Sequence, residues 1–121
     1  MSVESLLTRI AEILEANFPT GKDVEVYFTS TETVPASSTF TLTVEVPRNW
    51  KVKIKEVYAD AAPDCTYEWH LIHWSVVGNE YAFVRGVDME ELQRITLKVT
   101  NAGAAAQKVD VYIKGWGRKL G

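Results

Sequence analysis

The two histidines of the chain are the first candidates for chemistry, because imidazole nitrogens ligate metals and carry protons. His70 and His73 are three residues apart in a segment expected to be a strand, so their side chains point to opposite faces. Glu68 and His70 share a face, but a zinc site normally needs a third protein ligand, and the spacing fixes none. We therefore predict ordinary half-exposed strand histidines and no metal site.

Nucleophilic chemistry would have to use Cys65, the single cysteine, paired with a histidine. No glycine-rich turn surrounds Cys65, and a lone cysteine more often behaves as a small buried apolar residue. Asp60, Asp64 and Glu68 could supply the two carboxylates that a glycosidase needs, but a sugar-cleaving sandwich usually has a longer chain and larger loops. The segment 115–117 lacks the strand–loop–helix unit of a phosphate-binding motif. These residues predict a protein that is not an enzyme and needs no cofactor.

Aromatic residues are better candidates for a binding function. Tyr112 and Trp116 alternate with apolar residues of the last expected strand, which places them on the face opposite the core. Trp74 is expected to lie opposite the apolar face of its strand, and Trp50 follows a turn. Exposed aromatic side chains on a sheet favour a protein interface or a platform for a sugar ring, while a two-layer core that buries most of them is the third possibility. The candidate interface residues on the sheets are Trp50, Trp74, Tyr112 and Trp116.

The elements that carry these residues are expected to be β-strands. Residues 39–46 read Thr-Phe-Thr-Leu-Thr-Val-Glu-Val, an alternation that only a strand with one buried face produces. Similar runs between turn signals predict an all-β fold, an antiparallel β-sandwich of jelly-roll type with about seven strands. The expected strands are 23–30, 38–46, 51–60, 65–74, 80–87, 94–100 and 108–116.

The same alternation predicts the core and two irregularities. A bulge or face switch is expected near Lys55, because Glu56 occupies an inward position and the next residue is apolar. Gly78 and Asn79 predict a hairpin between the strands on either side. The predicted core consists of Phe40, Leu42, Val44, Val52, Ile54, Trp69, Leu71, Ile95, Leu97, Val99, Val111 and Ile113.

The first 20 residues have a helical period instead. Val3, Leu7, Ile10 and Leu14 follow the spacing of one helix face, which predicts an amphipathic helix over residues 3–17. The predicted organisation is thus an N-terminal helix in 1–20 and a sandwich domain in 21–121. A helix of this length is marginal in water, so its apolar stripe is expected to pack on another surface. Val3, Leu7, Ile10 and Leu14 are therefore candidate interface residues toward a partner subunit or a larger particle, and packing on the chain's own sandwich is the alternative.

Length and charge limit the remaining functions. The 121 residues suffice for one domain with its own core, and a net charge of −3 argues against a nucleic-acid partner. One cysteine cannot form an intrachain disulfide, and neither a signal peptide nor a bilayer-length apolar run is seen. We therefore expect no membrane association and a protein that folds in a reducing cytoplasm.

Several segments resemble small β-sandwich structural proteins of tailed-virus particles, such as capsid decoration and minor virion proteins. The segments that carry this resemblance are a strand that ends in Val-Pro, Lys-Val-Lys-Ile-Lys-Glu-Val-Tyr at 51–58, Ile-Thr-Leu-Lys-Val-Thr-Asn at 95–101 and Val-Asp-Val-Tyr-Ile-Lys-Gly-Trp at 109–116. The resemblance implies a non-enzymatic virion component, assembled in the host cytoplasm, whose partners are copies of itself or a viral shell protein. The alternative is a carbohydrate-binding module that uses exposed Trp and Tyr.

Overall fold

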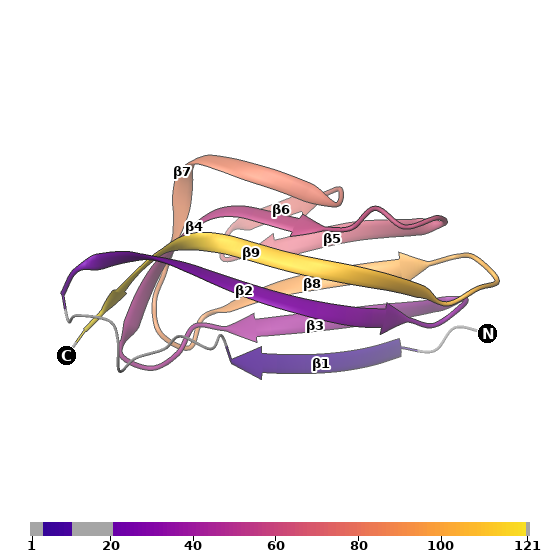
Figure 1. Cartoon of the computed structure of the whole chain (residues 1–121), viewed down its shortest axis with the longest axis horizontal. Helices are drawn as coiled ribbons and strands as arrows, with labels where there is room; N and C mark the ends of the chain where they lie inside the picture. The colour runs from indigo at the N-terminus through magenta and orange to yellow at the C-terminus, as the bar shows by residue number, and fades with distance from the viewer. Residues whose placement is uncertain (1–3, 11–20, 121) are drawn as a thin grey trace.

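The structure is a computed structural model that describes residues 4–10 and 21–120, and the chain forms nine β-strands in these ranges (Figure 1). The strands lie in two layers. Their bounds are β1 (Glu4–Ile10), β2 (Asp23–Val34), β3 (Ser38–Glu45), β4 (Trp50–Ala59), β5 (Cys65–Leu71), β6 (Trp74–Val77), β7 (Glu80–Met89), β8 (Arg94–Asn101) and β9 (Gln107–Lys119).

Strands β2 to β9 pair as one long hairpin that is rolled up on itself. β5 pairs with β6 at the tip, followed by β4 with β7, β3 with β8 and β2 with β9, and every pair is antiparallel. Successive pairs alternate between two sheets, ordered β3-β8-β5-β6 and β2-β9-β4-β7. This nested order is the arrangement of an eight-stranded jelly roll. The predicted antiparallel sandwich is therefore confirmed, with eight strands in place of about seven.

β1 differs from the sequence prediction, because Glu4–Ile10 form a strand where a helix was expected over 3–17. It extends the first sheet by pairing in parallel with β3, from Glu4 opposite Thr39 to Ile10 opposite Glu45. An edge strand presents unpaired backbone N–H and C=O groups, and pairing with them can override a weak helix propensity. Of the predicted helix stripe, Leu7 and Ile10 lie on β1, whereas Val3 and Leu14 lie outside the described residues.

The core between the two sheets agrees with the prediction. All twelve residues predicted to be inside are buried, and no more than 8% of any of them is exposed. The bulge near Lys55 is also confirmed, because the register of β4 shifts between Ile54 and Glu56 against both neighbouring strands. The period-two alternation thus located both the buried face and its main irregularity.

The turns after β5 are placed differently from the prediction. The chain reverses at Ile72, whose φ is +50°, so the expected strand 65–74 is divided into β5 and β6. Gly78 and Asn79 do not make a hairpin, because β6 and β7 lie in different sheets. The backbone N–H of Gly78 donates to the Tyr67 carbonyl (3.0 Å), and the Asn79 side-chain amide donates to the Ala59 carbonyl (3.1 Å). These bonds tie the crossover to both sheets.

Asn101 joins three segments at one end of the sandwich. Its side-chain amide donates to the carbonyls of Val34 (3.2 Å), Pro35 (3.3 Å) and Ala105 (2.9 Å), and its Oδ1 accepts from the Gly103 N–H (2.9 Å). Asn101 is 1% exposed, and its bond to the Val34 carbonyl is buried. β2 extends to Val34 beside this network, into residues that were predicted to form a loop.

Replacing Asn101 with alanine is expected to lower the free energy of unfolding by about 1 to 3 kcal/mol, because the buried Val34 carbonyl loses its side-chain donor and three part-buried bonds are lost with it. The matched control is Asn79→Ala, which removes one side-chain hydrogen bond from a half-buried site. Urea unfolding of both variants measures the difference. Equal midpoints for the two variants would contradict the role given to the Asn101 network.

Candidate binding surfaces

The structure separates the aromatic residues that were predicted to lie at an interface. Trp50 is completely buried at the start of β4, so this assignment is corrected: Trp50 is a core residue. Trp74 and Trp116 keep 49% and 47% of their surface exposed and lie on strands of different sheets. Tyr112 is half-buried on β9. Trp74, Tyr112 and Trp116 therefore remain available for binding, on two separate surfaces.

The histidines do not gather ligands around them. His70 Nε2 lies 2.9 Å from Glu68 Oε1 on the same sheet face, as their spacing predicts, and both side chains are partly exposed. His73 lies in the turn between β5 and β6. Within residues 4–10 and 21–120, no group of three His, Cys, Asp or Glu side chains is arranged to hold a metal ion.

Cys65 lies half-buried at the first position of β5. Burial raises the pKa of its thiol, and the neighbouring Asp64 carboxylate raises it further, although a hydrogen bond with Tyr67 opposes the shift. The thiolate is the nucleophilic form of cysteine, and a raised pKa lowers its population at neutral pH. The environment of Cys65 therefore makes it less reactive than a free cysteine.

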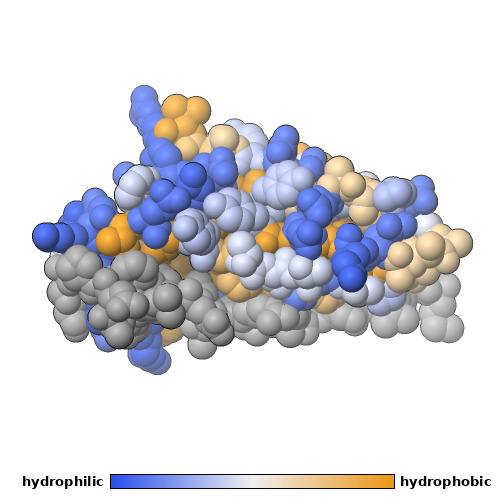
Figure 2. Space-filling view, in the orientation of Figure 1, coloured by the Kyte–Doolittle hydropathy of each residue, from blue (hydrophilic) through white to orange (hydrophobic). Residues whose placement is uncertain are grey.

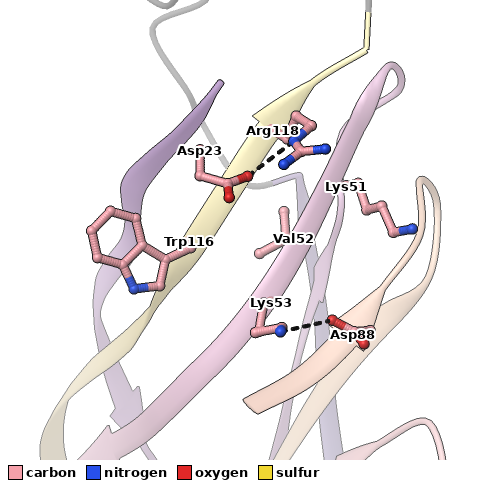
Figure 3. A pocket seen from close by; sticks show the side chains of 7 residues that line it. All are labelled: Asp23, Lys51, Val52, Lys53, Asp88, Trp116 and Arg118. Atoms are coloured by element: carbon pink, nitrogen blue, oxygen red, sulfur yellow. Dashed lines mark hydrogen bonds and ion pairs between the residues drawn. The ribbon is translucent and has the colours of Figure 1, made fainter. Parts of the chain in front are cut away.

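The outer face of the β2-β9-β4-β7 sheet carries a shallow hollow around Trp116. Cross-strand register places Trp116 beside Glu25 on β2 and Lys53 on β4, and places Lys53 beside Asp88 on β7. Arg118 follows two residues later on β9, and thus on the same face. The hollow has a volume of about 530 Å³ (Figure 3). Its lining residues are Asp23, Lys51, Val52, Lys53, Asp88, Trp116 and Arg118.

Two ion pairs form opposite sides of this hollow. Arg118 Nε lies 3.0 Å from Asp23 Oδ1 near Trp116, and Lys53 Nζ lies 3.8 Å from Asp88 Oδ1 on the other side (Figure 3). All four side chains are about half exposed or more, and exposed ion pairs contribute little to stability. The hollow thus presents both donors and acceptors that the fold does not require for its own stability.

An aromatic row continues from Trp116 across the same sheet face. Tyr27 on β2 is 56% exposed, and its ring stacks on that of Tyr112 with centroids 6.0 Å apart. Tyr112 is in register with Tyr58 on β4. A second hollow of about 530 Å³ lies at this end of the row and is lined in part by Tyr58, Tyr81 and Tyr112. We call Trp116, Tyr27, Tyr112 and Tyr58 the aromatic row.

A second surface lies on the edge strands β6 and β7 and the turn before them. Ring contacts join Trp74 to Phe83 (centroids 5.6 Å apart) and Tyr81 to Phe83 (4.8 Å). Figure 2 shows an apolar group protruding beside a hydrophilic one at the corner of β7. The β6–β7 surface is defined by its exposed apolar side chains, which are Ile72, Trp74, Val77, Tyr81 and Val84.

The exposure of Val84 comes from a large bulge in β7. Ile54 is in register with Val87 and Glu56 with Ala82, so residues 83–86 face Lys55 alone. Gly86 has a φ of +73°, and a Cβ there would lie 2.5 Å from Cγ of Lys53, so the bulge suits glycine at this position. The bend leaves Phe83 buried and Val84 92% exposed.

Sequence reasoning did not identify Val77 or Val84 as surface residues. Val77 falls in the segment expected to be a hairpin connection, and Val84 in the expected strand 80–87, where a valine is usually assigned to the core. The sequence also gives no reason to associate Lys51 and Lys53 with Trp116, which lies more than 60 residues further along the chain. The missing information was strand register, which brings residues distant in sequence together.

No protein-family model matches the sequence, and no curated protein matches it. Solved structures match in fold. A chain in the atomic structure of Sulfolobus Turreted Icosahedral Virus superposes with a TM-score of 0.53 at 9% identity, over 82% of this chain and 31% of that chain. A mutant of PliG-Ec, a periplasmic inhibitor of g-type lysozyme from Escherichia coli, superposes with a TM-score of 0.46 at 13% identity. The match covers 90% of this chain and 98% of that chain.

The viral match, with a TM-score of 0.53, agrees with the fold described above. The viral match shows that a similar β architecture occurs in a virus, and the identity is too low to transfer a function from it. The described residues contain no helix that is both long and apolar enough to cross a bilayer. The molecule is therefore a jelly-roll protein with two candidate binding surfaces, the β6–β7 surface and the face around Trp116.

Proposed function

We propose that this protein is a non-enzymatic structural component of a virus particle, which binds neighbouring copies of itself or a viral shell protein through the β6–β7 surface. The observation that carries the proposal is the exposure of large apolar side chains on two edge strands. Val77 is 83% exposed and Val84 92%, and Trp74 on β6 is 49% exposed. Soluble monomers normally protect sheet edges, so exposed apolar side chains on two edge strands favour contact with another chain.

Two other findings support a virion role. The eight-stranded jelly roll is a common fold of viral capsid proteins, and the fold match to a chain of a Sulfolobus virus agrees with that use. The sequence segments that resemble tailed-virus structural proteins point to the same role. Since the structural match is not to a tailed virus in particular, the proposal extends to virions in general, with assembly in the host cytoplasm.

The composition of the β6–β7 surface also fits a protein partner. The cores of protein interfaces are enriched in aromatic residues and depleted in charged ones. Two of the five residues that define this surface, Trp74 and Tyr81, are aromatic, and the exposed charged residues Glu80 and Arg85 lie next to it on β7. Its carrier strands are rigidly held, since β7 pairs along β4 and β6 pairs along β5. A preformed surface of this kind loses little conformational entropy on binding.

Replacing both Val77 and Val84 with aspartate is expected to convert an oligomer of the wild-type chain into a monomer. Both side chains project into solvent, so the substitutions should leave the fold unchanged while placing charge in the proposed interface. Light scattering after size-exclusion chromatography measures the mass. The control is Trp116→Ala, which removes a similarly exposed aromatic from the other surface and should not change the mass.

A wild-type chain that stays monomeric at millimolar concentration would contradict self-association. Incubation with a shell protein of the source virus then tests the other partner, by co-sedimentation with the assembled particle. Failure of the wild-type chain to co-sediment would overturn the proposal.

A further inference from the structure

We propose that the hollow around Trp116 binds a pyranose ring of a neutral glycan. This site lies on the outer face of the β2-β9-β4-β7 sheet and is separate from the β6–β7 surface. The proposal therefore goes beyond the proposed assembly role and can succeed or fail independently of it.

The indole of Trp116 supplies the stacking platform. It is 47% exposed, and Figure 3 shows it extending from β9 toward β2, clear of Lys53 and Asp88. The face of an indole ring carries partial negative charge, and the C–H groups on one face of a pyranose carry partial positive charge. A sugar ring can therefore lie flat against the indole while its hydroxyl groups point outward around its edge.

The polar groups beside Trp116 match those hydroxyl groups. A hydroxyl both donates and accepts hydrogen bonds, and the two ion pairs present an acceptor next to a donor on each side of the hollow. Asp23 and Asp88 can accept from sugar hydroxyls, while Lys53 and Arg118 can donate to them. Lys51, which lies 3.6 Å from Glu90, adds a further donor at the margin.

The charges of the hollow favour a neutral sugar over the other plausible occupants. Five of the seven lining residues are charged, whereas the core of a protein interface is depleted in charge. Three of these are cations and two are carboxylates, and each carboxylate is paired with a cation in the hollow. An anionic ligand would have to compete with Asp23 and Asp88 for the same donors. A polyol can bind both members of each pair.

The aromatic row supports a ligand longer than one sugar ring. Trp116 and Tyr112 are four residues apart on β9, or about 13 Å at the rise of an extended strand. Tyr27 lies between them on the neighbouring strand and stacks on Tyr112. The second hollow, with Tyr58 and Tyr112, lies at the far end of the row. A glycan chain that runs along β9 would contact several of these rings.

The proposal is tested by electrophoresis of the full chain in native gels that contain soluble glucan, mannan or galactan. At least one of these neutral polymers should retard the wild-type protein. Calorimetry with oligosaccharides of that polymer then measures affinity. Trp116→Ala should weaken binding at least about tenfold, equivalent to about 1.4 kcal/mol, and Trp116→Phe should weaken it less because a ring remains. Trp74→Ala is the matched control, since Trp74 has nearly the same exposure as Trp116 and lies on the other surface. This variant should bind the sugar as the wild-type protein does.

Asp88→Asn identifies the charge of the ligand. For a neutral sugar, loss of the carboxylate should weaken binding several-fold, whereas an anionic polymer should bind the variant more tightly. Three results would overturn the proposal: no retardation by any of the neutral polymers, equal effects of Trp116→Ala and Trp74→Ala, or tighter binding after Asp88→Asn. Binding that persists in the Val77 and Val84 aspartate variant shows that the site is independent of assembly. Loss of sugar binding in that folded variant would contradict the separate site.

Discussion

Replacing Leu97 with alanine is expected to lower the free energy of unfolding by about 2 to 5 kcal/mol, as for other fully buried leucines. Leu97 is 1% exposed at the middle of β8, in register with Leu42 on β3 and Trp69 on β5. Both neighbours are themselves buried in paired strands, so they can move little to fill the space. The cavity should therefore persist, which places the cost in the upper part of this range.

Urea unfolding followed by tryptophan fluorescence measures this change. The matched control is Lys98→Ala, one residue further along β8, because Lys98 is exposed on the opposite face of the same strand. Its effect should stay within about 0.5 kcal/mol. Similar midpoints for the two variants would show that the buried face of β8 has been misplaced.

The alternation of apolar and polar residues was sufficient to predict the fold class and the buried face. Every second side chain of a strand points inward, whichever strand it pairs with. It was not sufficient for topology. The partner of β2 is β9, some 80 residues away in sequence, and no local pattern specifies that pairing. The turn at Gly78 and Asn79 is an example. These residues predict a turn, but they do not specify whether the next strand returns to the same sheet. Here the hydrogen bonds between Asn79 and Ala59 hold the chain on the other sheet.

The candidate sites show the same limit. Trp50 could have been assigned to the core from sequence, since it precedes the inward Val52 and Ile54 by two and four residues. Val84 could not have been placed on the surface, because its exposure depends on a bulge that sets residues 83–86 against one residue of β4. The Trp116 hollow likewise requires register across four strands, which brings Asp23, Lys53 and Asp88 together.

The two surfaces need not compete for one function. Eight-stranded jelly rolls occur both in capsids and in lectins, so the fold is compatible with either role and decides neither. The β6–β7 surface is apolar and lies on sheet edges, while the Trp116 hollow is charged and lies on a sheet face. A particle component that binds its neighbours by one surface would leave the other free to contact a glycan.

Replacing Gly115 with alanine is expected to destabilise the fold by about 3 kcal/mol or more, at the upper end of the cost of overpacking. A Cβ on Gly115 would lie 2.2 Å from the Lys53 carbonyl oxygen, 3.0 Å from the Lys53 carbonyl carbon and 3.1 Å from Cα of Ile54. All three are backbone atoms, so no side-chain rotation relieves the contact. β9 would have to move away from β4 at the bulge that sets the strand register.

Gly117→Ala provides the graded comparison for this prediction. A Cβ on Gly117 would lie 3.0 Å from Cγ1 of Val26 and 3.2 Å from the ring of Trp50, and these side chains can shift by a few tenths of an ångström. Its cost should therefore be clearly smaller than that of Gly115→Ala in the same urea experiment. Because both glycines flank Trp116, the pair also tests why the segment is Gly-Trp-Gly: close packing of β4 and β9 beneath the indole requires residues without side chains. A Gly115 variant as stable as the Gly117 variant would remove that explanation.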